Sequence, residues 1–550
     1  SSEGSRWAPL APEPCITWLF TVTVMATANL KEYAGFEYDE EDALSPLQKL
    51  YFTGEMYAKY EPSVDALKKL VDTEGEDEDA WNEFEETFDK FMDFSWCSNW
   101  DGKKYDIIFY GVSGYTGYLM MEYLKRTAIP KNPEKFTFAF AGRTVSKVAE
   151  MRDREFMGTP HEDTPILRCS YDDVVSVIDL AKSAHCIVNV AGPYMLAQGE
   201  TLVDACCYCG THYCDVSGEI PWTIRALELN EHAKKGKALI SPSAAVAGAY
   251  PDLMVMALRN KLWTDTGKEL RRATIYARGG GAGGGTSGGT LATRAAMGSA
   301  PDAIRKKMAD PYSLGGFVPD RDRNGMKEVT IQPGTGQVTL KIRKEDTDAI
   351  LSKVSQDPIT GIWRAPHVYA YFDTRIVRRS NAQLADLEDR PYGRNFTFQE
   401  FVMLPPEMLQ QAAAIQEAGG ELPKGPAGPS VSSEKEALMA QGKYFKQGEG
   451  PPLEELGDAW TAQFAYAETV DGQSMKCSFC GRDGYYETAR CAVEYAMTCR
   501  FDYAELPHKG GCLNAAVAGQ NFYLRRIIQS GVKYSMGKWL EEEDCAPPDF

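Results

Sequence analysis

The chain has 550 residues, of which 43% are hydrophobic and 25% are charged, and its formal net charge is −19. This length can form more than one hydrophobic core, and the composition is typical of globular proteins rather than of disordered chains. Nucleic-acid binding needs clustered Lys and Arg side chains that contact the phosphates, whereas acidic residues outnumber basic ones in this chain. We therefore predict no nucleic-acid partner.

Residues 1–100 are predicted to form an acidic helical extension. Apolar side chains recur at helical spacing in residues 43–57, 62–70 and 81–94, and residues 31–100 hold 20 Asp and Glu against 6 Lys and Arg. These helices either pack on the rest of the chain or bind a second protein, and the sequence leaves both alternatives open.

An apolar run at residues 16–28 is about seven residues too short to span a bilayer. No other stretch approaches that length, so we expect the chain not to span a membrane. The apolar run is instead a candidate for part of a targeting leader, although only Arg6 precedes it. We therefore expect a soluble protein, either cytoplasmic or imported into an organelle such as a plastid.

The most informative segment is 105–117, YDIIFYGVSGYTG, in which an apolar strand leads through a glycine turn into a helix. Gly111 would let the chain turn sharply off the strand, and Gly114 would remove a side chain where a pyrophosphate approaches the backbone. Gly117 would let the helix pack closely on the sheet, so that the unpaired N–H groups of the helix point at the anion. The pattern predicts a dinucleotide site, although three spaced glycines also occur in ordinary turns.

The next apolar run, residues 136–141, bears on which dinucleotide binds. In dinucleotide folds the end of this strand meets the adenine ribose, where an acid binds the 2′-hydroxyl and an arginine accepts a 2′-phosphate. Here Arg143 follows the strand, Lys147 lies one helical turn further on, and no acid is present. We therefore predict NADP rather than NAD, the alternative being that Arg143 is a solvated loop residue.

Short apolar runs then alternate with amphipathic stretches as far as residue 243. Buried runs of four to six residues separated by helical patterns indicate parallel strands joined by crossover helices. We predict strands at residues 166–169, 186–191, 212–216 and 238–241, and helices at residues 116–126, 174–182, 201–210 and 221–235. The predicted fold class is α/β, with a doubly wound Rossmann domain at residues 101–244.

Seven short segments, in order, resemble the saccharopine dehydrogenase-like oxidoreductases, the family that includes the mycobacterial trans-acting enoyl reductases. The resemblance extends from about Tyr105 to Trp539. It rests on GVSGYTGYL (111–119), AGR (141–143), the run NVAGPYMLAQGETLVDACCYCGTHYCDVSGE (189–219), TSGGTLAT (286–293), DTRIVRRS (373–380), GRDGYYETA (481–489) and LPHKGGCLNAAVA (506–518).

The resemblance implies an NADP-binding Rossmann domain, followed by a mixed α/β domain that covers the nicotinamide. It also implies hydride transfer to or from an imine, enoyl or related carbonyl-type carbon of a small-molecule or lipid-like substrate. By position, it assigns the nucleotide to the 111–117 turn and Arg143, and it places residues 190–194 beside the nicotinamide ribose. The candidate cofactor-binding residues are thus Gly111, Ser113, Gly114, Tyr115, Thr116, Gly117, Arg143, Lys147, Ala191, Gly192 and Pro193.

The candidate catalytic residues are Tyr194, Asp215 and Asp252, which follow predicted strands at the carboxyl edge of the sheet, where ligands bind in such folds. Ser217 and Glu219 lie at the same edge. Tyr194 could donate a proton or could simply stack on its neighbours, and stacking is the preferred interpretation.

The chain departs from the family where the substrate would bind. In residues 243–253 small apolar residues replace an aromatic residue, an acid and a hydroxyl, and the family's Asp-Pro-Gly-Tyr has become Asp-Gly-Tyr-Tyr at 483–486. Residues 279–289 are so rich in glycine that we expect a loose loop. The alternative function is therefore a non-catalytic or weakly active nucleotide-binding accessory or scaffold subunit of a large complex, docked through residues 1–100. A third class, the short-chain dehydrogenases, needs a Tyr-x-x-x-Lys pair, which is missing between Gly102 and Ser243.

The rest of the chain is predicted as a second, mixed α/β domain at residues 245–436 and a C-terminal segment at residues 437–550. The second domain carries the glycine-rich loop and ends in a polar Gly/Pro/Ser linker at residues 417–435. The resemblance implies that the C-terminal segment folds back towards the Rossmann domain.

Fourteen cysteines and six histidines raise the question of a metal site. Cys477 and Cys480 have the spacing of half a zinc site, but no second pair lies at a suitable distance, and the histidines are scattered. We therefore predict no metal site, and we expect buried free thiols, which suit a reducing compartment.

Overall fold

The computed structural model describes residue 79 and residues 102–131, 135–197, 199–281, 285–316, 326–331, 337–404, 408–410, 414–415 and 431–545. Apart from Asp79, the predicted N-terminal extension lies outside the described residues. Within the described ranges, no helix combines the length and the apolar character that crossing a bilayer would require.

The first sheet has seven strands in the order β15-β6-β5-β4-β1-β2-β3, and all of its neighbours pair in parallel. The chain starts in the middle and winds outwards in both directions, so the predicted doubly wound Rossmann fold is confirmed. Its strands are β1 (Tyr105–Tyr110), β2 (Phe138–Gly142), β3 (Ile166–Arg168), β4 (Ala184–Asn189), β5 (His212–Asp215), β6 (Leu239–Ser241) and β15 (Gly511–Cys512).

Strand β1 shows why the strands of the first sheet are unbroken apolar runs in the sequence. Successive side chains point to opposite faces, and both faces are covered. Ile107 and Phe109 lie in a core that continues into the second sheet, whereas Ile108 and Tyr110 lie in a separate core on the other face.

The helices of this part of the chain follow the predicted alternation, with one correction. They are α5 (Tyr115–Tyr123), extended by η5 (Leu124–Ala128) and α6 (Ile129–Lys131), then α7 (Val145–Phe156), α8 (Val174–Ser183), α9 (Glu200–Tyr208), α10 (Ile220–Leu227) and α11 (Asn230–Lys235). The single helix predicted at residues 221–235 is wrong, because the chain breaks at Leu229. The N–H groups of Glu228 and Leu229 bond back only three residues, and this tight turn buries the Leu229 side chain.

The second sheet is mixed, in the order β10-β11-β12-β7-β13-β14-β16, with β12 and β7 parallel and the other pairs antiparallel. The predicted second, mixed α/β architecture is therefore confirmed. Its strands are β7 (Leu270–Gly280), β10 (Ser355–Gln356), β11 (Trp363–Ala365), β12 (Thr397–Met403), β13 (Trp460–Thr469), β14 (Ser474–Arg482) and β16 (Lys533–Met536), and a separate hairpin comprises β8 (Met326–Ile331) and β9 (Val338–Arg343).

The expected loose loop at residues 279–289 is wrong in its described parts. Gly279 and Gly280 end strand β7 and pair with Thr461 and Trp460 of β13. A Cβ atom on Gly280 would lie 2.4 Å from Nε1 of Trp460, so glycine is needed there for close contact rather than for looseness. Further on, Ser287 caps helix α13 (Gly288–Gly298), with its Oγ accepting from the N–H of Thr290.

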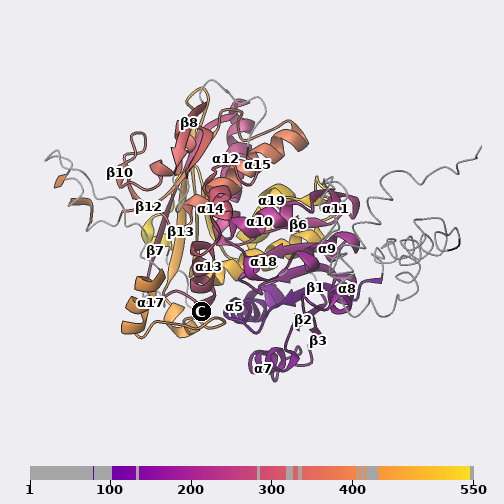
Figure 1. Ribbon diagram of the computed structural model, residues 1–550. Coiled ribbons are helices and arrows are strands. Elements are labelled where there is room, and N and C mark those ends of the chain that lie inside the picture. The colour runs from indigo at the N-terminus through magenta and orange to yellow at the C-terminus, as the bar shows by residue number, and fades with distance from the viewer. Residues whose placement is uncertain are drawn as a thin grey trace, which may run out of the picture.

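Four long helices lie between the two sheets: α12 (Val246–Thr266), α15 (Ala370–Glu388), α18 (Gly484–Phe501) and α19 (Ala515–Gln529). Figure 1 shows the first sheet at the right, the long strands of the second sheet at the left and α13 between them. One apolar core extends from Phe109 of β1 through these helices to Phe479 of β14. The remaining helices are α14 (Asp302–Ala309), α17 (Val431–Ala440) and α20 (Glu542–Cys545), with single turns η6 (Tyr194–Leu196), η8 (Lys344–Asp346), η9 (Asp348–Ile350) and η10 (Leu453–Leu456).

The C-terminal part of the chain contributes to both sheets. Strands β13, β14 and β16 belong to the second sheet, whereas β15 extends the first and α18 packs on β1, β4 and β5. Of the linker predicted at residues 417–435, residues 417–430 lie outside the described ranges, and the remaining residues are helical because α17 begins at Val431.

Candidate functional site

A cavity of about 1190 Å³ lies at the carboxyl edge of the first sheet and is walled on its other side by elements attached to the second sheet. Its volume is somewhat larger than the roughly 300–1,000 Å³ of most small-molecule sites. The 111–116 turn and the end of β2 line one part of the cavity, and the turn after β4 lines the middle. The far part is lined by α13, by the segment before α15 and by the start of α18.

The glycine turn has the three properties that its spacing predicts. Gly111 has φ +89°, and a Cβ atom there would lie 2.7 Å from the backbone nitrogen of Ala191. A Cβ atom on Gly117 would lie 2.3 Å from Cα of Val112, so the third glycine allows the helix to approach the turn. At Gly114, by contrast, the nearest non-neighbouring atom to a Cβ would be the carbonyl oxygen of Gly111 at 3.6 Å, so a side chain there would project into the cavity.

Helix α5 begins at this turn with its N-terminus open. No side chain caps the helix, and no acidic residue occupies its first turn. Ser113, Tyr115 and Thr116 line the cavity beside Gly114. Unpaired N–H groups and the positive end of a helix dipole therefore face a space that a phosphate group can enter.

Arg143 and Lys147 lie on the rim of the same cavity. Both side chains are exposed, and neither forms an ion pair within the described part of the chain. Burial raises the pKa of the neighbouring Tyr110, and the positive charge of Arg143 opposes that shift. One acid that the sequence analysis missed, Asp172 after β3, also lines this part of the cavity and accepts a hydrogen bond from the hydroxyl of Ser170.

The turn after β4 forms the middle of the cavity wall. Ala191, Gly192 and Pro193 line the cavity, and the Gly192–Pro193 peptide is cis. Asn189 holds this turn in place, because its Oδ1 accepts from the N–H of Ala191 at 2.9 Å. Its Nδ2 donates to the hydroxyls of Tyr171 and Tyr213 at 2.9 and 3.0 Å, which fixes the amide from the other side.

Tyr194 supports the turn from behind. Its ring stacks on Trp222 with centroids 5.6 Å apart and an angle of 26° between the planes. Its hydroxyl donates to the carbonyl of Asn189 at 2.8 Å, and burial raises its pKa well above the ordinary tyrosine value. This geometry favours the stacking interpretation over proton donation.

Asp215 is fully buried and does not line the cavity. Its carboxylate accepts from Nε1 of Trp222 at 2.7 Å and from the hydroxyl of Tyr213 at 3.0 Å, and also from the backbone N–H groups of Ser217 and Ser243 at 2.9 Å. Burial raises its pKa, and these donors oppose the shift. The two oxygens of this carboxylate accept four hydrogen bonds and so hold the turns at Ser217 and Ser243 together.

Asp252 lies outside the cavity as well. It is buried within α12, where it accepts from the hydroxyl of Tyr392 at 2.7 Å and from that of Ser380 on α15. Burial raises its pKa to about 7. The carboxyl group thus joins α12 to α15 and has no path to a bound substrate.

Ser217 lines the cavity, whereas Glu219 lies behind its wall. The carboxylate of Glu219 accepts from the backbone N–H groups of Tyr194 and Met195 at 3.1 and 2.6 Å. It also accepts from the hydroxyl of Thr293 on α13 at 3.1 Å, so Glu219 connects the turn after β4 to the far wall. Ser217 lines the cavity directly, with its hydroxyl 3.2 Å from that of Ser243.

The far wall holds the polar groups that the sequence analysis did not assign to the site. The hydroxyl of Tyr485 accepts from the N–H of Ser287 at 2.9 Å and so joins α18 to the start of α13. Arg294 and Tyr369 lie in the same wall, where burial raises the pKa of Tyr369 to about 12 and Arg294 opposes the shift. The motif at 286–293 was the available signal, because a serine cap followed by threonines begins a helix at the cavity.

Comparison with protein-family profiles finds no match for this chain. Curated relatives do match, over most of the length of both partners. A Mycobacterium tuberculosis protein provisionally named a trans-acting enoyl reductase is 28% identical over 439 residues, which is 78% of this chain and 97% of the relative. A Mycobacterium leprae protein named trans-acting enoyl reductase is 26% identical over 455 residues, with the same coverage. The resemblance inferred from the motifs is confirmed by these relatives.

Two solved structures align with most of this chain at low sequence identity. Apo saccharopine dehydrogenase (L-Glu forming) from Saccharomyces cerevisiae aligns with 78% of this chain and 99% of its own, at 11% identity and a TM-score of 0.40. Homospermidine synthase from Legionella pneumophila, in complex with NAD, aligns with 78% of this chain and 91% of its own, at 9% identity and a TM-score of 0.40.

Proposed function

We propose that this chain is an NADP(H)-dependent oxidoreductase that transfers a hydride between the nicotinamide and an enoyl, imine or related carbonyl-type carbon. The observation that carries the proposal is the open start of α5 at Gly114, with the uncommitted Arg143 on the rim of the same cavity. The relatives named trans-acting enoyl reductases favour an enoyl group on a small or lipid-like molecule as the substrate.

The residues present fit this cofactor. The backbone of Ser113–Thr116 would hold the pyrophosphate, because no Cβ atom fills the space above Gly114 and no side chain competes for the helix N-terminus. Arg143 and Lys147 would hold the 2′-phosphate, since both are free of ion pairs with described residues. Ala191, Gly192 and Pro193 would lie along the nicotinamide ribose. Gly117 would act by packing rather than by contact.

When bound, the cofactor supplies or accepts the hydride. The chain's own contribution is to exclude water and to position the substrate, which α13 and the segment before α15 do by walling the far part of the cavity. Arg294 is suited to hold a substrate carbonyl oxygen. Tyr369 lies in the same wall, and we propose its hydroxyl as the proton donor after hydride addition. We propose Tyr194 and Asp215 as positioning residues, since they hold the turns that line the cavity, and Asp252 as a residue that joins α12 to α15.

The cofactor preference is tested by replacing Arg143 with alanine. A charge-assisted hydrogen bond contributes roughly 1.5–3 kcal/mol, so the Kd for NADPH should rise about 10- to 100-fold while the Kd for NADH stays unchanged. Arg154→Ala is the matched control. Like Arg143, Arg154 is exposed, but it lies within α7, pairs with Glu155 and does not line the cavity. Titration of NADPH fluorescence measures each Kd, and an unchanged NADPH preference in Arg143→Ala would refute the assignment.

The reaction class is tested by following NADPH oxidation with an enoyl thioester, a cyclic imine and a ketone. We expect turnover with the enoyl compound. A chain that binds NADPH but oxidises it with none of the three would favour the accessory or scaffold alternative. The segment predicted to dock that scaffold, residues 1–100, lies outside the described ranges except for Asp79.

A further inference from the structure

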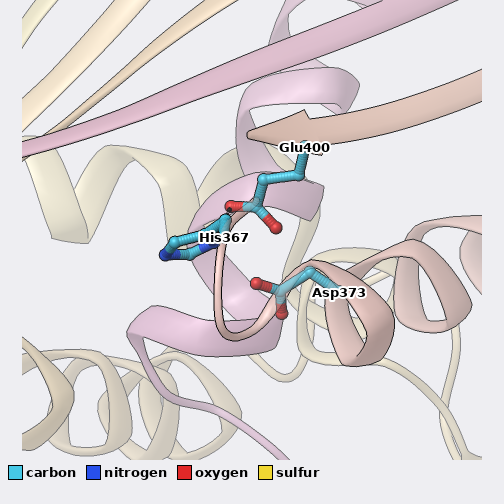
Figure 2. A group of neighbouring side chains, drawn as sticks. All are labelled: His367, Asp373 and Glu400. Atoms are coloured by element: carbon cyan, nitrogen blue, oxygen red, sulfur yellow. Dashed lines mark ion pairs between the residues drawn. The ribbon is translucent and has the colours of Figure 1, made fainter. Parts of the chain in front are cut away.

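Three side chains with metal-ligand atoms meet beside the far wall of the cavity (Figure 2). His367 lies in the segment between β11 and α15, Asp373 lies in the first turn of α15, and Glu400 lies in β12. One ligand atom from each residue lies within 4.8 Å of the other two, and Nδ1 of His367 is 3.4 Å from Oε1 of Glu400.

The cluster has more buried acceptor atoms than its hydrogen bonds satisfy. Both carboxylate oxygens of Glu400, a residue with no exposed surface, lack a hydrogen-bond partner. Asp373, which is 1% exposed, accepts from the N–H of Gly248 at Oδ1 but has no partner at Oδ2. Nδ1 of His367 is likewise without a hydrogen bond. Unsatisfied buried polar atoms are costly, so this arrangement calls for a further partner inside the cluster.

The charges of these three side chains indicate that the missing partner is positively charged. Among the described side chains, His367 is the one basic group that pairs with either carboxylate. Two buried carboxylates thus face a single imidazole, so the cluster needs either shared protons or a cation.

We propose that His367, Asp373 and Glu400 bind a single divalent transition-metal ion of the Zn²⁺ and Mn²⁺ class. Bonds of about 2.0–2.1 Å in a tetrahedral site place neighbouring ligand atoms about 3.3 Å apart, close to the separation between His367 and Glu400. The imidazole ligand argues against Mg²⁺ and Ca²⁺, and the lack of a thiolate in the cluster argues against Cu⁺. The N–H of Gly248 orients the Asp373 carboxylate and leaves its Oδ2 available for the ion.

The ion would act on the cavity through the elements that it joins. His367 immediately precedes Val368 and Tyr369, and Gly248 immediately follows Ala247, and these three neighbours line the cavity. The metal would thus fix the segment before α15 to β12 and to the kink of α12 at Gly248. The three ligands are positioning residues, and metal binding does not depend on the proposed NADP-dependent reaction.

Metal binding is tested on the full chain after chelator treatment and removal of the chelator. Titration with ZnSO₄ in a calorimeter should show one equivalent bound per chain. Addition of CoCl₂ should give visible d–d absorption that Zn²⁺ abolishes. Glu400→Gln and Asp373→Asn remove a charged ligand each with little change in shape, and each should weaken Zn²⁺ binding at least tenfold.

Glu494→Gln is the matched control, because it makes the same change at a buried acid whose carboxylate already has a hydroxyl partner, Tyr123, and which does not line the cavity. It should bind Zn²⁺ like the parent chain. The proposal fails if the parent chain shows no saturable binding of Zn²⁺, Mn²⁺ or Co²⁺, a result that needs no variant to fold. It also fails if Glu400→Gln and Asp373→Asn bind as tightly as Glu494→Gln. In either case the carboxylates share protons instead.

Discussion

At the glycine turn, the space available for a Cβ atom shows whether each glycine is needed for the fold or for ligand binding. Gly111 and Gly117 are needed for the fold, because a methyl group at either position would overlap backbone atoms of Ala191 or Val112. Gly114 has φ −94° and ψ 176°, an extended conformation that any residue adopts, and a Cβ there meets no close atom. Side-chain packing therefore does not explain the glycine at position 114, whereas a ligand that approaches the backbone there would explain it.

Gly114→Ala should therefore fold normally and lose dinucleotide affinity. Gly114 is the N-cap of α5, where alanine is less favourable than glycine by up to about 1 kcal/mol, so we expect the thermal midpoint to fall by no more than about 4 °C. The Kd for NADPH should rise at least tenfold, because the methyl group enters the space proposed for the pyrophosphate. Thermal denaturation and fluorescence titration measure the two effects.

Gly117→Ala is the contrasting variant, because its Cβ atom would lie 2.3 Å from Cα of Val112. Overpacking of this kind costs roughly 1–3 kcal/mol or more, so the thermal midpoint should fall clearly. An alanine at 114 that leaves NADPH binding intact would remove the main physical support for the nucleotide site.

At the scale of elements, the sequence predicts the parts whose signals are local. Strands β1 to β6 were predictable because most of them are buried on both faces and short connections join them, so apolar runs and helices alternate along the chain. The short strand β15 was not predicted, because it joins this sheet from the C-terminal segment. The glycine turn and Arg143 were predictable for the same reason, since a turn and the strand beside it form a self-contained unit. The break at Leu229 was not, because nothing in residues 221–235 interrupts the helical pattern.

The far wall and the metal-ligand cluster depend on contacts between distant segments. Tyr485 meets Ser287 across about two hundred residues, and His367 meets Glu400 only because β11 and β12 pair in the second sheet. Asp215 and Asp252 show what spacing along the chain does not reveal. Asp215 ends β5 and Asp252 lies within α12, and the hydrogen bonds of each buried acid join two elements.

The link between α12 and α15 at Asp252 gives a prediction about pH. The pKa of this carboxyl is about 7 in the folded chain against 3.8 for the model compound, so between these values the folded state holds a proton that the unfolded state has lost. Its contribution to stability therefore falls as the pH rises from about 4 to about 7 and stays constant above. Asp252→Asn cannot lose a proton, and its amide can still accept from Tyr392.

Compared with the parent chain, Asp252→Asn should be relatively more stable at pH 8 than at pH 5, by up to roughly 3 kcal/mol. Urea denaturation of both proteins at the two pH values measures the difference, and other titrating groups cancel in the comparison. If the stability difference between the two proteins does not change with pH, the carboxyl group keeps an ordinary pKa in the fold.

At the scale of the whole molecule, the two sheets share one core between them, and each sheet has a further core on its other face. The face of the first sheet that carries Ile107 and Phe109 is covered by α18 and continues through α12 to the second sheet. Strand β15, from the C-terminal segment, pairs with the edge strand β6. The cavity is made in the same way, with the nucleotide part on one sheet and the far wall on elements of the other.

A fragment of residues 101–244, the predicted Rossmann domain, should therefore not fold alone. It lacks α18, so Ile107, Phe109 and Val188 would face water, and it lacks β15, so the edge of β6 would be unpaired. We expect the fragment to aggregate or to show no cooperative urea transition by circular dichroism. Co-expression with residues 245–545 should restore a soluble complex, because the missing strand and helix are then supplied in trans. A cooperative transition in the isolated fragment would mean that the first sheet needs only its own helices, and that the cavity forms by docking of two independent domains.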